Sequence, residues 1–222
     1  MDILSDLNEP QREAVMHVDG PLLVLAGAGS GKTRVITRRV AQLIERGIAP
    51  ENILAITFTN KSAEEMRQRI GELNAPPGAT ICTFHSLCAR LLREFAETAG
   101  IDRNYTIYDR NDQIKITKRA IEDCHMTGTS LVPGGVHAAI SNAKNELKSP
   151  QAYAQRAGNY FQRGVAEIYR RYEVLLTDNN ALDFDDLLMR MAMLLRDRSD
   201  IREYLGRGYK YVLIDEYQDT NH

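Results

Sequence analysis

The chain has 222 residues, of which 43% are hydrophobic and 26% charged, so it is long enough for one or two domains that bury a core and stay in solution. Its formal net charge of −2 gives no overall basic field for nucleic acid, although a local groove can be basic on a neutral protein. No apolar run approaches the ~20 residues that cross a bilayer, and the three cysteines form no C-x-x-C pair, so we expect a cytoplasmic protein with reduced thiols and no membrane partner.

The first chemical signal along the chain is a glycine-rich segment. Apolar residues 21–25 predict a strand, and residues 26–33 then read Ala-Gly-Ala-Gly-Ser-Gly-Lys-Thr at the start of a helix. Glycines let backbone N–H groups turn towards an anion, and the helix N-terminus adds unpaired donors. Lys32 can reach terminal phosphates and the Thr33 hydroxyl can bind Mg²⁺, so the segment predicts a P-loop. Ala26 stands where the strict pattern has glycine, and the alternative is a chance glycine turn.

Residues 1–107 alternate short apolar segments with amphipathic ones. This alternation predicts a parallel sheet covered by helices on both faces, with the ligand-binding loops at one edge. Ser62 and Glu65 form a capping-box pattern that predicts the start of the second helix. The expected strands are 22–26, 53–58 and 79–83, and the expected helices are 32–46, 62–73 and 86–98.

The pattern changes over residues 108–182, where strand signals largely vanish and helical periodicity takes over. We expect an inserted helical subdomain with a glycine-rich loop at 126–135. Its ten basic residues, Lys144 among them, and eight acidic residues indicate a slightly basic face, but ordinary solvated helix surfaces explain that charge equally well. The expected helices are 113–124, 136–147, 150–157 and 162–176.

The end of the chain supplies a second chemical signal. A helix is expected after residues 183–186, and residues 211–215 predict a strand that returns the chain to the sheet and runs into Asp-Glu-Tyr-Gln-Asp at 215–219. In an ATPase, one carboxylate at a strand end holds Mg²⁺, which suits Asp215, and the next activates water, which suits Glu216. Alone, this segment could equally be a solvated turn, but a P-loop in the same chain favours an ATPase.

Four further segments and the acidic segment at 215–221 follow one ordered pattern with the P-loop. The set closely resembles the UvrD/Rep/PcrA group of superfamily 1 DNA helicases over essentially the whole chain, and that group's own P-loop shares the departure at Ala26. The resemblance implies an α/β fold in which residues 1–107 and 183–222 form a RecA-like P-loop NTPase domain and residues 108–182 an inserted all-helical subdomain. The segments are Leu-Asn-Glu-Pro-Gln at 7–11, Ile-Thr-Phe-Thr-Asn-Lys at 56–61, Thr-Phe-His-Ser at 83–86, Leu-Asp-Phe-Asp-Asp-Leu at 182–187 and Asp-Glu-Tyr-Gln-Asp-Thr-Asn at 215–221.

The resemblance also implies a site for ATP and Mg²⁺. Gln11 is expected to read the adenine and Arg34 to stack on it, although Gln11 could be a plain surface side chain. Glu216 is implied as the catalytic base, Gln218 as a residue near the γ-phosphate and Lys32 as a phosphate ligand. The other nucleotide-binding residues implied are Ala28, Gly29, Ser30 and Gly31, and the implied metal ligands are Thr33 and Asp215.

A third implied set binds single-stranded DNA. An aromatic ring stacks on any base and so serves sequence-independent binding. Phe58 could instead belong to the core, because it ends an apolar strand, and His85 could cap the following helix or form an internal hydrogen bond. The set consists of Phe58, Thr59, Asn60, Thr83 and His85.

The resemblance predicts the N-terminal, ATP-binding part of an ATP-dependent 3′ to 5′ DNA helicase or translocase that acts on single strands and single-strand/duplex junctions. Such a motor needs a second RecA-like domain that supplies arginine fingers, so the remaining helicase domains are expected partners, and the isolated chain should bind ATP without unwinding DNA. No Gly-Asp-x-x-Gln-Ser segment occurs here. Two alternatives stay open: the motor part of a helicase–nuclease subunit, and a passive module that binds nucleotide and single-stranded DNA.

Overall fold

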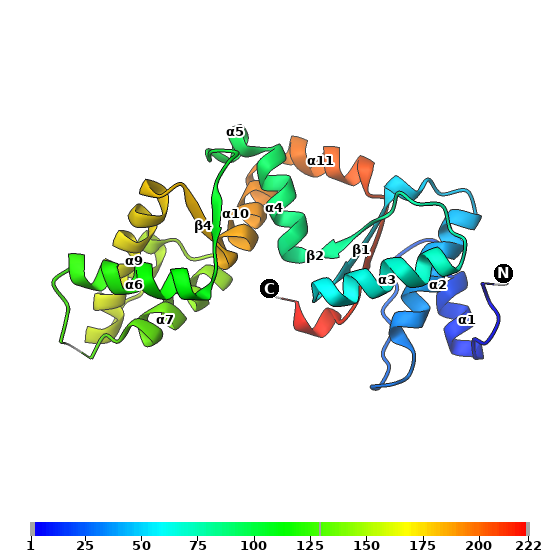
Figure 1. Ribbon diagram of the computed structural model, residues 1–222, viewed down its shortest axis with the longest axis horizontal. Helices are drawn as coiled ribbons and strands as arrows, with labels where there is room; N and C mark the ends of the chain where they lie inside the picture. Colours follow the sequence, from blue (N-terminus) through cyan, green and yellow to red (C-terminus); the bar gives the residue numbers. More distant parts are fainter. Residues whose placement is uncertain (1–2, 129, 221–222) are drawn as a thin grey trace. The chain divides into compact units, whose positions relative to one another are not determined.

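The computed structural model describes residues 3–128 and 130–220, which form two compact units. The first unit comprises residues 3–86 and 200–220, and the second comprises residues 87–199. The chain enters the second unit within α4 (Phe84–Glu94) and leaves it at the start of α11 (Ser199–Gly208), as can be followed in Figure 1. None of the described helices is long and apolar enough to cross a membrane.

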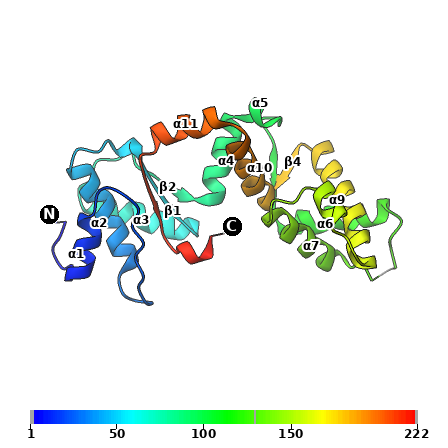
Figure 2. The ribbon, with the colours of Figure 1, turned by 180° about the vertical axis from the view of Figure 1, so that it is seen from behind.

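A parallel sheet of three strands, in the order β2-β1-β5, forms the centre of the first unit. Leu54 of β1 pairs with Thr80 of β2 and with Val212 of β5, and β5 lies beside β1 in both Figure 1 and Figure 2. Every residue of β1 is buried, as expected for the middle strand of a parallel sheet. The strands are β1 (Ile53–Thr57), β2 (Thr80–Thr83) and β5 (Tyr211–Ile214).

Two helices of the first unit pack on this sheet and confirm the predicted arrangement of a parallel sheet flanked by helices. Val40 and Leu43 of α2 and Met66 of α3 meet Ile53 of β1 in one buried cluster. Burying an aliphatic side chain of this size stabilises the fold by about 1.5–3 kcal/mol. The remaining elements are α1 (Glu9–Met16), α2 (Lys32–Glu45), α3 (Asn60–Glu72) and the short 3₁₀ helices η1 (Pro50–Asn52) and η2 (Tyr217–Asp219).

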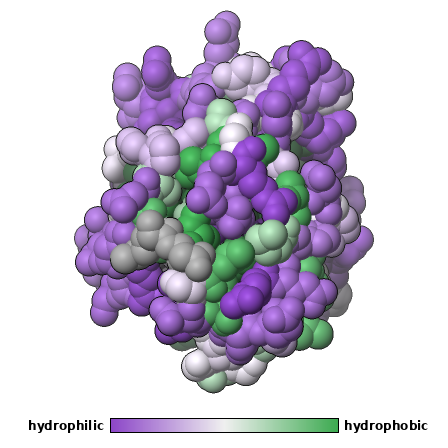
Figure 3. Space-filling view, turned by 90° about the vertical axis from the view of Figure 1, so that its right-hand side faces the viewer, coloured by the Kyte–Doolittle hydropathy of each residue, from purple (hydrophilic) through white to green (hydrophobic). Residues whose placement is uncertain are grey.

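The predicted strand at 22–26 is not formed. Residues 21–27 belong to no strand, and Leu23 and Leu25 are 67% and 86% exposed. A strand is completed by hydrogen bonds from a neighbour, and β5, an edge of the sheet, pairs with β1 alone among the described strands. Figure 3 shows hydrophobic side chains exposed among hydrophilic ones on the face that carries α1 and α2. An apolar run therefore predicts a strand correctly only where a partner strand is present.

Local signals shift two other predicted helices. The capping box of Ser62 and Glu65 is wrong, because α3 begins at Asn60 and the Thr59 hydroxyl accepts a hydrogen bond from the Ser62 N–H at 3.0 Å. The helix predicted at 86–98 is instead α4, which ends at Glu94, followed by the short α5 (Ala96–Ala99). The predicted strands at 53–58 and 211–215 each end one residue earlier in the structure.

The second unit is mainly helical, as the periodicity of 108–182 predicts. Its core includes the fully buried Tyr169 and Tyr172 of α9. The predicted loop at 126–135 is too long, because Pro133 begins α7, where the missing N–H of proline costs no hydrogen bond. The helices are α6 (Arg110–Asp123), α7 (Pro133–Asn145), α8 (Pro150–Gln155), α9 (Tyr160–Asp178) and α10 (Phe184–Asp197).

A short parallel strand pair, which the sequence did not predict, joins the two ends of this helical segment. β3 (Thr106–Tyr108) pairs with β4 (Ala181–Asp183), and α10 packs against α7. These contacts connect residues inside the predicted insertion with residues outside its boundaries at 108 and 182, so both belong to the same compact unit. The unit of residues 87–199 is therefore wider than the predicted insertion at 108–182, whose boundaries stay a prediction.

Candidate nucleotide and nucleic-acid site

The glycine-rich loop enters α2 through two left-handed residues. Gly29 has a φ of 74° and Gly31, the N-cap of α2, has a φ of 88°, a region that favours glycine. No side chain caps α2 at Gly31, so the first N–H groups of the helix are open to an anion. The Ser30 hydroxyl donates to the Gly27 carbonyl at 2.7 Å and fixes the turn. Ala28, like Gly29 and Ser30, is exposed at the loop tip.

Lys32, the first residue of α2, folds back over the loop. Its Nζ donates to the carbonyls of Ala26 and Gly27 at 3.3 and 3.2 Å. The ammonium therefore lies beside the same glycine-rich turn whose N–H groups would surround phosphate oxygens. This arrangement fits a nucleotide phosphate, because the ammonium lies beside the loop that leads into the uncapped N-terminus of α2.

Gln11 and Arg34 both contact backbone carbonyls near the loop. Gln11 Nε2 donates to the Ser30 carbonyl at 2.8 Å, and its Oε1 accepts from the Asn8 N–H in the capping box of α1. A Cβ at Gly31 would lie 2.9 Å from Gln11 Nε2, so glycine permits this approach. Arg34 Nη1 donates to the Asp6 carbonyl at 3.5 Å. Gln11 is therefore more than a plain surface side chain, and the adenine-binding roles of both residues stay predictions.

Asp215 directly follows β5 and contacts the P-loop helix α2. It is buried, and its Oδ2 lies 3.5 Å from the Thr33 hydroxyl, which donates to it. Its backbone N–H donates to the Ile56 carbonyl at 2.8 Å and holds the residue against β1. Burial, reinforced by the neighbouring charge of Glu216, raises the pKa of Asp215 above its ordinary value. Because both causes disfavour the carboxylate, a cation placed between Asp215 and Thr33 would be stabilising.

Glu216 and Gln218 form a tight turn after Asp215. Glu216 adopts a left-handed backbone with φ 51° and ψ 50°, which is rare for a residue with a side chain. The Asp219 N–H donates to the Glu216 carbonyl at 2.9 Å, and the Gln218 amide donates to the Glu216 carboxylate. Gln218 therefore hydrogen-bonds to Glu216 in the structure. The expected role of Gln218 near a γ-phosphate did not predict this contact.

The five residues predicted to bind DNA lie at the ends of β1 and β2 or directly after them. Thr57 and Thr83 are paired in the sheet, so these segments meet at the edge from which Asp215 also projects after β5. Phe58 is 61% exposed, so the alternative that it belongs to the core is wrong. Asn60 is exposed at the first position of α3.

Two residues of this set have structural roles as well. Thr59 is the N-cap of α3, and the buried Thr83 accepts from the Ser86 N–H at 3.1 Å. Because Thr83 provides this cap at the start of α4, the alternative that His85 caps the helix is not supported. His85 lies half-buried in the first turn of α4.

Comparison with known proteins gives one consistent result. Residues 7–222 match the model of the UvrD/REP helicase N-terminal domain. The ATP-dependent DNA helicase PcrA of Bacillus subtilis (strain 168) is 45% identical over 223 residues, and those of Staphylococcus aureus (strain Mu50) and Staphylococcus epidermidis (strain RP62A) are 44% identical over 222 residues. Each alignment covers 99% of this chain and 30% of the relative, so the chain spans about a third of the length of these relatives.

Proposed function

Because the chain belongs to the UvrD/REP helicase family, we propose that it is the ATP-binding part of an ATP-dependent DNA helicase. The observation that carries this proposal is the 3.5 Å contact between Thr33 of the P-loop helix and Asp215 after β5, which are 182 positions apart in the sequence. Two motifs that each predict phosphate chemistry thereby become one site.

The same pair of residues suits Mg²⁺. Hydroxyl and carboxylate oxygens are ligands that this hard cation prefers, and it usually keeps several waters besides one or two protein ligands. Thr33 and Asp215 would hold the ion, which supplies positive charge that offsets charge on the phosphates when bound. A bound cation would stabilise the Asp215 carboxylate and so lower its raised pKa. The electrostatic environment of Asp215 therefore favours a cation at the same place as its ligand chemistry does.

The remaining residues have separable roles in hydrolysis. Lys32 binds phosphate oxygens by charge-assisted hydrogen bonds. Glu216 accepts a proton from the attacking water, as a general base must. Gln218 orients the Glu216 carboxylate through its amide, and the left-handed turn at Glu216 sets the direction of that side chain. Gln11 and Arg34 contact the base after leaving their carbonyl partners.

We propose single-stranded DNA, and its junctions with duplex, as the polynucleotide partner. Phe58 offers an exposed ring for base stacking at the edge of the sheet that carries Asp215, and polar groups of Thr59 and Asn60 lie beside it. A 3′ to 5′ direction, a cytoplasmic location and the remaining helicase domains as partners are extensions that rest on family membership alone.

The two other candidate functions are weaker. A helicase–nuclease subunit is not favoured, because the relatives reported above are DNA helicases by name. A passive binding module would not require the Glu216 carboxylate to be held by Gln218.

Replacing Lys32 with alanine tests the nucleotide site in this chain. We expect affinity for ATP with Mg²⁺ to fall roughly 10- to 150-fold, because a hydrogen bond to a charged group contributes about 1.5–3 kcal/mol. Titration calorimetry measures the change, and circular dichroism checks the fold. Lys61→Ala is the matched control, because that lysine side chain is 87% exposed and its ion pair to Glu65 is long at 4.0 Å. Equal affinity in a folded Lys32→Ala chain would show that the loop does not bind phosphate.

Replacing Phe58 with alanine tests the DNA surface. Binding of oligo-dT should be weak, should fall with added salt, and should lose about 1–3 kcal/mol in the variant through lost stacking. Fluorescence anisotropy at several salt concentrations measures this. Tyr160→Ala is the control, because Tyr160 is 64% exposed and lies on α9 in the second unit. Measurable binding that is insensitive to Phe58→Ala would remove Phe58 from the DNA site.

A further inference from the structure

A buried lysine lies among three carboxyl groups in the second unit. Lys144, at the end of α7, is 1% exposed. Its Nζ lies 2.7 Å from Glu173 Oε1 and 2.8 Å from both Asp183 Oδ2 and Asp186 Oδ1. The Tyr172 ring centroid is 5.1 Å from the same nitrogen. Lys144 was counted above among residues of a basic surface, and that reading is wrong because its charge is enclosed.

The charges in this cluster do not balance if every acid is ionised. Three carboxylates would share one ammonium, and Arg190 approaches Asp186 and Glu173 only to 3.9 Å. Like charges gathered in a buried site cannot all ionise without a large penalty. One of the three carboxyl groups is therefore expected to be protonated in the folded unit.

Burial and hydrogen bonding together single out Asp186. Asp183 accepts from three donors, namely Lys144, the Tyr172 hydroxyl at 2.8 Å and the Asp186 N–H at 2.7 Å. Glu173 is 23% exposed, so water reaches part of its carboxylate, although its Oε1 is buried beside Lys144. Asp186 is 2% exposed and, among the described residues, accepts from Lys144 and, at 3.1 Å, from the Asp183 N–H. Its ionised form is thus the least stabilised of the three.

We propose that Asp186 holds a proton in the folded second unit near neutral pH, so that folding of this unit takes up a proton and becomes less favourable as the pH rises. The cluster joins α7, α9 and α10 at the point where β4 ends. A change in its charge therefore acts on the packing of these three helices. This proposal does not depend on the proposed helicase function.

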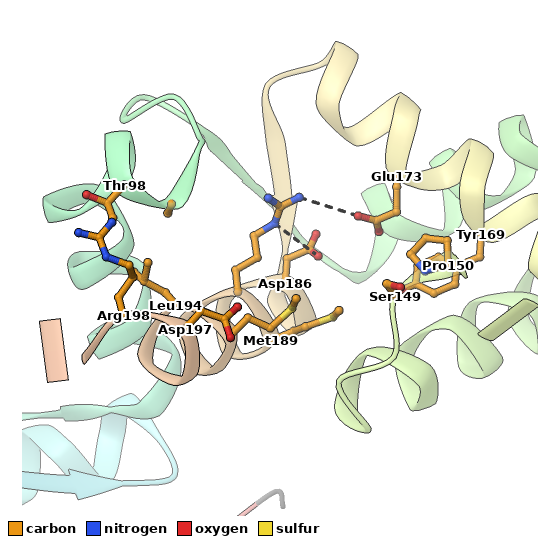
Figure 4. A pocket seen from close by; sticks show the side chains of 13 residues that line it. Thr98, Ser149, Pro150, Tyr169, Glu173, Asp186, Met189, Leu194, Asp197 and Arg198 are labelled. Carbon is orange, nitrogen blue, oxygen red and sulfur yellow. Dashed lines mark ion pairs between the residues drawn. The ribbon is translucent and has the colours of Figure 1, made fainter. Parts of the chain in front are cut away.

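The electrostatics of the site agree with the geometry. Burial is the main cause that raises the pKa of Asp186 to about 7, Lys144 opposes it, and the charges of Asp183 and Glu173 add to it. A pocket of about 420 Å³ within the second unit borders the cluster, and Figure 4 shows Asp186 and Glu173 lining it, with dashed lines for their ion pairs to Arg190. The charged and titratable groups that face Asp186 or line this pocket are Lys144 from α7, Tyr169, Tyr172 and Glu173 from α9, Asp183 at the end of β4, and Arg190, Asp197 and Arg198 from α10 and its C-cap.

The direction of the pH effect follows from these values. An aspartate in an unfolded chain titrates near pH 3.9, well below the value of about 7 for Asp186 in the fold. Between these limits the folded unit binds one proton more than the unfolded chain. Stability is then highest at the acid end of this window, falls as the pH rises, and levels off above about pH 7. One such proton changes the unfolding equilibrium constant by up to about tenfold per pH unit.

Asp186→Asn tests the proposal, because the amide keeps an acceptor for the Asp183 N–H and cannot ionise. The chain is equilibrated in urea between about pH 5 and pH 8, then pulsed with deuterium at one fixed pH, and peptides from α7 and α9 are read by mass spectrometry. Asp197→Asn is the matched control, since Asp197 is exposed and lies on the same helix. Stability should fall more, or rise less, with increasing pH in the wild type and Asp197→Asn than in Asp186→Asn, because the opposite contribution of His137, whose pKa is lowered by burial, is common to all three.

A wild-type slope retained in Asp186→Asn would overturn the proposal. If that variant does not fold, Glu173→Gln gives a second test, because removing one neighbouring carboxylate should lower the pH at which stability levels off. An unchanged levelling-off point in Glu173→Gln would equally overturn it.

Discussion

The 222-residue chain by itself is expected to bind ATP with Mg²⁺ and to hydrolyse it very slowly. Glu216, Lys32 and the pair Thr33 and Asp215 can hold the ground state, but they supply little new positive charge as charge builds on the γ-phosphoryl oxygens. An arginine finger contributes about 10³–10⁵ in rate in such enzymes. By resemblance, this family's fingers belong to a second RecA-like domain, and Arg34 is engaged with the Asp6 carbonyl and is expected on the base.

Single-turnover hydrolysis with saturating oligo-dT measures this rate, and Lys32→Ala supplies the background. Strand displacement of a short duplex should also be absent, because two domains must close and open on the strand for translocation. Turnover of about one per second or faster, which is in the range typical of complete enzymes, would show that the second domain is not needed for charge stabilisation. Strand displacement by the pure chain would contradict the same account.

Much of the candidate site was predictable because its chemistry is local. Gly29 and Gly31 adopt left-handed conformations that glycine favours, and Lys32 follows at the position where a helix N-terminus meets a phosphate. The acids at 215 and 216 follow a strand as predicted. The partner of the Gln11 amide was not predictable, because it is the backbone carbonyl of Ser30 and every residue carries such a carbonyl. The Gln218–Glu216 contact depends on the left-handed turn at Glu216, which no sequence pattern indicated.

The fold was predictable where several signals agreed. β1 combines a continuous apolar run with neighbours on both sides, and it was found within one residue of its predicted end. Residues 22–26 show the same kind of run without a partner strand, and the prediction failed there. β3 and β4 have three residues each, too few for alternation to appear, and only their pairing across 75 residues makes them strands. Tertiary partners, which a single sequence does not reveal, decided each of these differences.

Replacing Lys144 with methionine is expected to destabilise the second unit by about 3–5 kcal/mol. Methionine keeps an unbranched apolar stem of similar length but removes the ammonium, so Asp183, Asp186 and Glu173 would face one another without their cation. Removing one partner of a buried ion pair is costly because it leaves the other charge uncompensated. Part of this cost should disappear towards about pH 5, where the remaining acids can take up protons.

Urea unfolding at about pH 7, read on peptides of α7 and α9, measures the loss. Lys148→Met is the control: that lysine lies just beyond α7, pairs with the exposed Glu146, and should contribute less than about 1 kcal/mol. Adding Asp186→Asn to Lys144→Met removes one of the unbalanced acids, so the double variant should be more stable than Lys144→Met at about pH 7. A loss below about 1 kcal/mol in Lys144→Met would mean that water reaches the cluster and replaces the ammonium, and the three acids would then not act as a buried unit.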